Sequence, residues 1–226
     1  MTLVSENNSN LSSRQSGKSF VIYLVLFYAA WTFWAWVIYP FVEQLEQTTF
    51  AYAAVIFIFH ALIFILPVFL YLQLIDKVNP LTYLKLKQYW KRGIAVGLIL
   101  SIIIFLVTFL RSGPLQWNHL YITWNSILNS SIFVGFFEEV PFRGFILQKL
   151  QSKYSFWTAN LISSLLFMGI HVPGYMLLHT LTVYNLAYVF IFGVVMAVIF
   201  YFSKSLWSSI VAHSLNDFLS QVIFHL

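Results

Sequence analysis

The chain has 226 residues, of which 60% are hydrophobic and only 8% are charged, and its mean hydropathy is +0.82. An ordinary globular domain carries about 25% charged residues, so this composition excludes a soluble protein. The basic residues behind the net charge of +5 are spread among several loops, which argues against nucleic acid as a partner. The chain contains no cysteine, which excludes disulfides, thiol nucleophiles and thiolate metal sites.

Long apolar stretches recur along the chain and favour helices rather than the alternating strands of a membrane barrel. We expect an all-α fold, a polytopic transmembrane bundle of about seven (six to eight) spans, because each span needs about 20 apolar residues. Residues 1–19 are polar and predict a flexible N-terminal tail, followed by one membrane domain, 20–226, with its catalytic core in about 121–226. The expected spans are approximately 20–42, 50–75, 93–110, 121–150, 156–172, 181–202, and 206 to the C-terminus. The fifth is short enough to be tilted or re-entrant.

The distribution of basic residues predicts the orientation of the bundle. With the N-terminus in the cytoplasm, ten of the twelve Lys and Arg residues fall on the cytoplasmic side. Arg143 lies inside the fourth span, and Arg111 falls on the outer side beside almost no other positive charge. We therefore predict an integral membrane protein, most simply of a bacterial plasma membrane, with a cytoplasmic N-terminus.

The fourth expected span contains three charged residues, Glu138, Glu139 and Arg143. Each charge in the middle of a span costs roughly 2.5–3.5 kcal/mol, so the group needs a reason. Glu139 and Arg143 are four residues apart and can pair on one helix face. Glu138 is offset by about 100°, which leaves it free to face a water molecule as a general base. Pro141 lacks an N–H for the carbonyl of Phe137 and predicts a bend beside the carboxylates. The alternative is a buried pair that only locks helices together.

Two later spans each carry one histidine on a polar stripe with helical spacing. His171 follows Asn160, Ser164 and Phe167, and His213 lies among Ser209, Asn216, Asp217 and Ser220. A single histidine in a span is often only a helix–helix contact, and we interpret the isolated His60 in this way. Two histidines after a Glu-Glu helix instead predict one water-accessible cavity that contains a base and two imidazoles.

These three motifs, E-E-x-x-x-R over 138–143, F-x-x-x-H over 167–171 and H-x-x-x-D over 213–217, resemble the CAAX protease and bacteriocin-processing (CPBP or Abi) family of intramembrane proteases. The resemblance covers the C-terminal part of the chain. It implies a helical intramembrane fold and hydrolysis of a peptide bond in a membrane-associated or lipidated protein or peptide. It also implies a site open toward the cytoplasm. Some members of the family are linked to bacteriocin immunity.

The resemblance implies a role for each motif residue. Glu138 would activate the attacking water with help from His171, and His213 would stabilise the oxyanion together with the residue at position 217. Glu139, Arg143 and Phe167 would support them. An ionised Asp217 cannot donate a hydrogen bond to an oxyanion. Either Asp217 is protonated, or it orients His213, or Asn216 is the donor.

The cofactor and the alternatives remain open on the sequence. Glu138, His171 and His213 could form a zinc site, but the H-E-x-x-H motif of soluble zinc proteases is absent. We favour a metal-free glutamate mechanism, with zinc as the alternative. A non-catalytic immunity or scaffold protein that acts by binding would share these motifs. A transporter would also place carboxylates at mid-depth, but it would normally show inverted repeats, which the sequence lacks.

Overall fold

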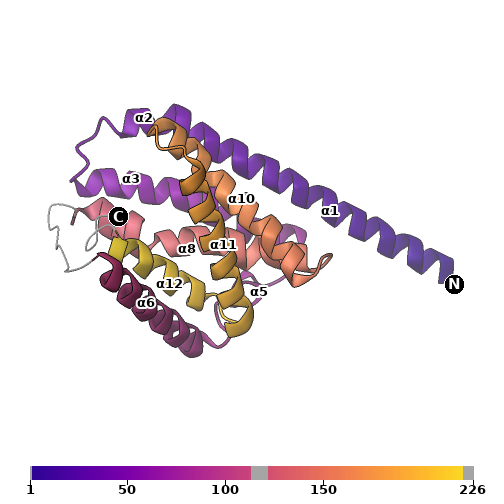
Figure 1. Cartoon of the computed structure of the whole chain (residues 1–226). Coiled ribbons are helices and arrows are strands. Elements are labelled where there is room, and N and C mark those ends of the chain that lie inside the picture. Colours follow the sequence, from indigo (N-terminus) through magenta and orange to yellow (C-terminus); the bar gives the residue numbers. More distant parts are fainter. Residues whose placement is uncertain (1, 113–121, 221–226) are drawn as a thin grey trace.

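The computed structural model describes residues 2–112 and 122–220 of the chain, which fold into an all-α bundle (Figure 1). In the N-terminal half, the α-helices and π-helical segments (η) are α1 (Thr2–Phe33), η1 (Trp34–Ile38), α2 (Tyr39–Val42), α3 (Phe50–His60), η2 (Ala61–Ile65), α4 (Leu66–Leu70), η3 (Tyr71–Ile75), α5 (Pro80–Tyr83) and α6 (Trp90–Ser112). They are followed by α7 (Trp124–Ile127), η5 (Leu128–Ile132), α8 (Val134–Glu139), η6 (Val140–Leu147), α9 (Gln148–Gln151), α10 (Phe156–Leu177), α11 (Val183–Ser203) and α12 (Trp207–Phe218).

Within the described residues, five helical segments are long and apolar enough to cross a membrane. They are Gly17–Val42, Phe50–Ile75, Trp90–Leu110, Phe156–Leu177 and Val183–Ser203. The all-α membrane fold expected from composition is therefore confirmed, and these spans match five of the expected segments closely.

The other two expected spans are also helical but differ in kind. The segment expected at 121–150 is interrupted at Phe133, between η5 and α8. The segment expected from 206 onward forms α12, which has 12 residues, and the last residues of the chain lie outside the described part. Neither belongs to the long apolar group, because the first is interrupted at Phe133 and the described helix of the second has only 12 residues.

Two further expectations are changed by the helix bounds. Helix α10 continues through Pro173 to Leu177, so the fifth span has 22 residues and is not a short re-entrant segment. Helix α1 begins at Thr2 and includes most of the polar stretch 1–19. The flexibility of that stretch and the division of the chain into tail and membrane domain stay predictions.

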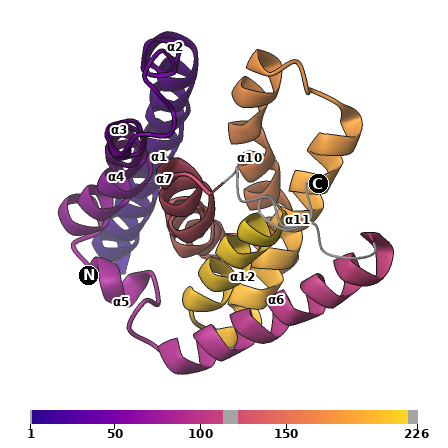
Figure 2. The same ribbon diagram turned by 90° about the vertical axis from the view of Figure 1, so that its left-hand side faces the viewer.

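The segment α8–η6 forms the centre of the bundle, with α12 beside it and the long helices around it (Figure 2). All eight residues from Val140 to Leu147 are buried. Phe142 contacts the rings of Phe27 in α1 and Phe167 in α10, with ring centroids 5.9 and 5.2 Å apart. Large apolar side chains on α1, α6 and α11 are exposed instead, as is normal for lipid-facing helices. The charged helix is thus separated from lipid by its neighbours.

Helix α1 is joined to α10 by side-chain to backbone hydrogen bonds. The indole Nε1 of Trp31 donates to the carbonyl of Ile170 at 2.6 Å, and the hydroxyl of Tyr28 donates to the carbonyl of Leu166. The ring of Tyr28 also lies against Gly169, where a Cβ atom would be 3.3 Å from it. These contacts hold α1 beside the turn of α10 that precedes His171.

Helix α12 packs closely on α8 because small residues lie at the contact, as in many membrane helix pairs. A Cβ atom at Gly135 would lie 2.5 Å from the carbonyl oxygen of Ile210 and 2.6 Å from Oγ of Ser214. The hydroxyl of Ser214 donates to the carbonyl of Ile132 at 2.9 Å. Gly135 therefore sets the distance between the two helices that carry Glu138 and His213.

We expect Gly135→Ala to lower the thermal stability of the purified protein, because its methyl group would overlap with the backbone of α12. Overpacking of this kind costs about 1–3 kcal/mol. The matched control is Gly174→Ala on α10, where a Cβ atom meets nothing within 4 Å. Thermal unfolding in detergent should show a lower melting temperature for Gly135→Ala than for Gly174→Ala. Equal melting temperatures would contradict this account of the contact.

Candidate active site

The buried ion pair predicted from helical spacing is present at the centre of the bundle. Nη1 of Arg143 lies 2.9 Å from Oε1 of Glu139, and the two side chains are 1% and 0% exposed. Nη2 of Arg143 donates to the carbonyl of Gly193 in α11 at 3.1 Å. The guanidinium lies 4.1 Å from the ring centroid of Phe167, within the range of a cation–π contact. Arg143 therefore ties together three helices.

The same carboxylate orients a histidine from the last described helix. Nδ1 of His213 lies 2.8 Å from Oε1 of Glu139, and because a carboxylate only accepts, the imidazole donates from Nδ1. His213 is buried, with its ring 4.8 Å from the ring of Phe192. Glu139 thus joins two motifs that are 74 residues apart. The sequence predicted the Glu139–Arg143 pair but not this contact.

The second histidine is held in the same tautomer by its own helix. Nδ1 of His171 lies 3.0 Å from the carbonyl oxygen of Phe167, which can only accept, so Nδ1 again carries the proton. Nε2 of His171 lies 3.8 Å from Oε2 of Glu138, and Nε2 of His213 lies 3.8 Å from the same oxygen. The Nε2 atoms of both imidazoles therefore face one carboxylate oxygen.

Glu138 differs from its neighbour as the 100° offset predicts. Its side chain is 17% exposed, against 0% for Glu139. Among the described residues, its Oε2 atom accepts no hydrogen bond. The distance from this oxygen to each Nε2 atom is 3.8 Å, which is longer than a direct hydrogen bond. Polar contacts at this separation are commonly bridged by a water molecule. Glu138 is thus the carboxylate of the pair that faces the two imidazoles without a protein donor.

Asp217 and Asn216 lie at the edge of this group. Oδ2 of Asp217 is 3.7 Å from Nε2 of His213, and the Asn216 amide donates to Oδ1 of Asp217 at 3.2 Å. Because Glu139 already holds Nδ1 of His213 at 2.8 Å, Asp217 is not needed to orient that ring. Of the three interpretations of Asp217, the orienting role fits the geometry least.

The remaining polar residues of the two stripes stabilise helix contacts. The Asn160 amide donates to the carbonyl of Val194 in α11 at 3.3 Å, and the Ser164 hydroxyl donates to Asn160 at 3.0 Å. Ser209 and Ser220 donate within their own helix, to the carbonyls of Leu206 and Asp217. Asn160, Ser164 and Ser220 thus bond away from the site, whereas the Ser209 side chain also interacts with the Glu139 carboxylate.

His60 does not join the site. Its ring lies 5.4 Å from that of Phe137 and 5.7 Å from that of Trp31, measured between ring centroids. These aromatic contacts support the structural role predicted for His60.

The helix changes its winding where the two carboxylates end. The N–H of Val140 still donates to the carbonyl of Phe136, and the segment from Val140 to Leu147 is π-helical. Pro141 has no N–H to continue the α-helical ladder, which explains why the wider winding starts here. The bend predicted at Pro141 thus takes the form of a π-helical segment, a feature that often marks functional sites.

A cavity of about 810 Å³ adjoins the site, between α6, α10, α11 and α12. Three of its lining residues contact the site. Tyr175 lies 6.0 Å from the ring of His171, Phe192 lies 4.8 Å from that of His213, and Asn216 bonds to Asp217. Glu138 and the two histidines are not among the residues that line it. One layer of side chains, which includes Tyr175 and Phe192, therefore separates the cavity from Glu138 and the two histidines.

The carboxylates and imidazoles of this group are also the candidate ligands of a metal ion. Within 2–112 and 122–220, no three or more His, Cys, Asp or Glu side chains are arranged so that they could hold a metal ion. The zinc set considered from the sequence, Glu138, His171 and His213, does not fit such a site as the side chains lie. A metal-free mechanism stays a prediction.

Residues 120–219 match the family model described as Type II CAAX prenyl endopeptidase Rce1-like. The three-motif segment is therefore similar to the CAAX prenyl endopeptidase family. The match covers every residue of the three motifs, so the resemblance identified from them is confirmed. Among curated proteins and among solved structures, no match to the chain is found.

The Rce1-like segment supports, in general terms, an integral membrane protease that acts on a membrane-associated protein. It contains α8, α10, α11 and α12, which carry the ion pair, both histidines and Asp217. Helices α1 to α6 lie outside the match.

We expect Arg143→Ala to destabilise the protein strongly, because it leaves the buried Glu139 carboxylate without its cation. Breaking a buried pair costs about 3–5 kcal/mol. The comparison variant is Lys149→Ala, which removes a 2.6 Å pair with Asp76 whose side chains are 14% and 15% exposed. This pair is only partly buried, so its loss should cost less than the loss of the fully buried pair. Thermal unfolding monitored by size-exclusion chromatography should rank Arg143→Ala well below Lys149→Ala, and the reverse order would contradict the central role of this pair.

Proposed function

We propose that the chain is an intramembrane endopeptidase in which Glu138 activates the attacking water and the two histidines assist. The observation that carries this proposal is the convergence of both Nε2 atoms on Oε2 of Glu138, each at 3.8 Å. That oxygen has no protein donor among the described residues, so it is available to a water molecule.

The proposed reaction begins when Glu138 takes a proton from water. The resulting hydroxide attacks the carbonyl carbon of the scissile bond, and the carbonyl π electrons move to the oxygen. When the tetrahedral intermediate collapses, the C–N bond breaks and the proton held by Glu138 passes to the departing amine nitrogen. His171 can relay this proton, because Nδ1 already donates to Phe167 and Nε2 presents its lone pair toward Glu138.

The oxyanion needs a hydrogen-bond donor, which His213 supplies from Nε2 in its imidazolium form. Its Nδ1 proton is committed to Glu139, so the second nitrogen is the one that faces the reaction. Glu138, Glu139 and Asp217 all lie within 3.8 Å of this ring and balance the charge of an imidazolium. The amide of Asn216 lines the neighbouring cavity and is the second donor in reach of a bound carbonyl.

The proposed substrate is a membrane-associated or lipidated protein or peptide. The adjoining cavity is lined by aromatic and aliphatic side chains, among them Phe105, Tyr188 and Phe192, which suit an apolar segment. The name of the matched family suggests a prenylated C-terminus as the first chemistry to try. Bacteriocin immunity and peptide maturation are further roles that this activity would serve.

We expect Glu138→Gln to lower peptide cleavage by about 10²–10⁴-fold, because an amide cannot take the proton from water. A suitable probe is an internally quenched peptide that ends in a prenylated CAAX sequence, tested beside its unprenylated form. The control is Glu43→Gln, an exposed carboxylate between α2 and α3. Both variants should show the melting temperature of the unmodified chain. Undiminished turnover in Glu138→Gln would remove the assignment of Glu138 as the base, whereas no cleavage by the unmodified chain would favour the alternative of an immunity or scaffold protein that acts by binding.

The metal-free mechanism predicts that cleavage survives a strong chelator. Incubation with the chelator, followed by desalting, should leave the rate unchanged within the error of the assay. A loss of activity that zinc restores would show that the histidines and Glu138 rearrange into a metal site, while the protease assignment would stand. The chelated protein should also be checked for an unchanged melting temperature, so that unfolding is not mistaken for metal loss.

A further inference from the structure

The two ends of the bundle differ sharply in charge. At one end, here the basic end, helices α1, α6, α10 and α12 begin and η3, α9 and α11 terminate. Side-chain contacts hold this end together: Lys149 pairs with Asp76 at 2.6 Å, and the ring of Trp207 donates to the carbonyl of Leu86 at 2.9 Å. Its Lys and Arg residues with described side chains are Lys18, Lys77, Lys85, Lys87, Lys91, Arg92, Lys149, Lys153 and Lys204.

The charged side chains that the structure describes at the opposite end are acidic, and Arg111, near the end of α6, is the basic residue of the sequence on that side. Glu43 and Glu46 lie in the connection between α2 and α3. Apart from Arg143, which is buried in the centre, every Lys or Arg side chain that the structure describes belongs to the basic end. Basic residues mark the cytoplasmic side of membrane proteins, so the end with the two glutamates faces away from the cytoplasm.

The candidate site lies nearer to the acidic end. His171 is about 22 Å along α10 from Phe156 at the basic end, and about 9 Å from Leu177, by the rise of an α-helix. Asp217 is the last but one residue of α12, which begins at the basic end with Trp207. Two separate helices thus place the site in the same half of the bundle.

The cavity beside the site opens in that half as well. Its residues on α11 run from Tyr184, at the start of the helix, to Met196, past its middle, and Thr180 lies in the turn between α10 and α11. Tyr184 is 78% exposed and Tyr188 is 52% exposed, which places its mouth at that turn.

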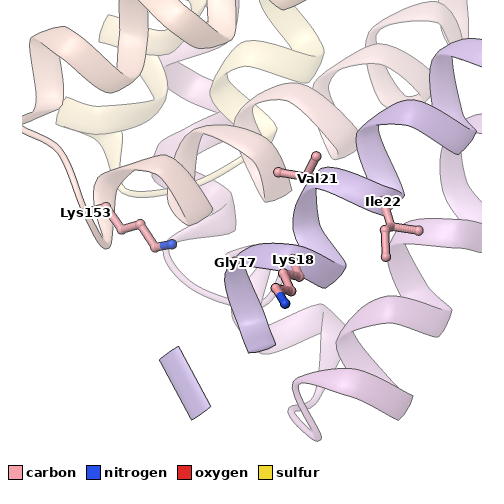
Figure 3. A pocket seen from close by; sticks show the side chains of 5 residues that line it. All are labelled: Gly17, Lys18, Val21, Ile22 and Lys153. Atoms are coloured by element: carbon pink, nitrogen blue, oxygen red, sulfur yellow. The ribbon is translucent and has the colours of Figure 1, made fainter. Parts of the chain in front are cut away.

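A second cavity, of about 770 Å³, lies at the basic end (Figure 3). It is lined by Gly17, Lys18, Val21, Ile22 and Lys153. None of these residues belongs to the candidate site or contacts a residue of it in the way that Tyr175 and Phe192 do in the first cavity.

We infer that the substrate reaches the active site from the extracytoplasmic side of the membrane, through the cavity between α6, α10, α11 and α12. This inference rests on the proposed function and on the charge asymmetry of the bundle. It differs from the cytoplasmic opening that the resemblance to the family implies. The substrate class that follows is an exported or outer-leaflet peptide, not a protein that remains in the cytoplasm.

The lining of the cavity narrows the chemistry of that peptide. Among the described residues that line it there is no Lys, Arg, Asp or Glu, and the polar side chains are neutral: Thr108, Thr180, Asn185, Asn216 and Ser220, besides the tyrosines. A charged group of the substrate would lose its hydration in such an uncharged cavity and gain no ion pair in return, which is unfavourable. The segment of substrate beside the scissile bond is therefore apolar and uncharged, and a free terminal carboxylate lies outside the cavity.

Cysteine labelling in whole cells tests the sidedness, since the chain has no cysteine of its own. Thr180→Cys places a thiol at the mouth of the cavity, and Ser152→Cys places one at the basic end, in the exposed connection between α9 and α10. A membrane-impermeant maleimide should label Thr180→Cys in intact cells and Ser152→Cys only after lysis. The reverse pattern would overturn the inference and restore a cytoplasmic opening. This readout does not depend on catalysis.

A second measurement tests whether the cavity is the path of the substrate. Thr180→Cys would be assayed on the quenched peptide before and after attachment of a bulky maleimide, with Ser152→Cys labelled after lysis as the control. Labelling of Thr180→Cys should reduce the cleavage rate at least tenfold, and labelling of Ser152→Cys should leave it unchanged. Unaltered cleavage by labelled Thr180→Cys would overturn the path. Loss of the proposed function itself would show separately, as full activity in Glu138→Gln.

Discussion

The architecture depends on one buried carboxylate, Glu139, which is shared by a guanidinium and an imidazole. Arg143 and His213 approach the same oxygen, at 2.9 and 2.8 Å, in a place where neither charge has access to solvent. Burial of any one of these groups alone would be costly, so each requires the other two. Arg143, Glu139 and His213 therefore fix one another's positions. The helix with the carboxylates, the helix behind Phe167 and the last helix can pack only in the arrangement that satisfies all three.

This arrangement explains how one pair of adjacent glutamates serves two purposes. Glu139 holds both Arg143 and His213 through its Oε1 atom, whereas Oε2 of Glu138 lies 3.8 Å from both Nε2 atoms and has no donor among the described residues. The two imidazoles are fixed by acceptors on their Nδ1 side, a carboxylate in one case and a backbone carbonyl in the other. Pre-orientation of this kind lowers the reorganisation that the reaction requires, which is where much of enzymatic rate enhancement originates. The bilayer contributes by excluding competing water from the surroundings.

The sequence was sufficient for the parts of this picture that depend on local spacing. The i, i+4 rule predicted the Glu139–Arg143 pair, and the offset of one residue separated Glu138 from it. Hydropathy gave the five long spans to within a few residues. The contact between Glu139 and His213 was not predictable, because it joins residues 74 positions apart and periodicity carries no information on which helices are neighbours. The fifth span was expected to end at about 172, whereas α10 continues through Pro173 to Leu177. The position of the cavity was not predictable either, because it depends on how α6, α10, α11 and α12 pack together.

Helix α1 lies outside the segment that matches the family, yet it donates hydrogen bonds to two carbonyls of α10, and the second belongs to the residue just before His171. The aromatic donors are Tyr28 and Trp31, one turn apart. A fragment limited to residues 120–219 would expose the carbonyls of Leu166 and Ile170 to lipid. The turn of α10 that carries His171 would then lose its contacts with α1. The matched segment therefore depends on contacts with α1, which lies outside it. A chimaera that exchanges α1 between related proteins must keep the two aromatic donors in the same register. Without them, α10 would lose two contacts that help to orient the His171 ring.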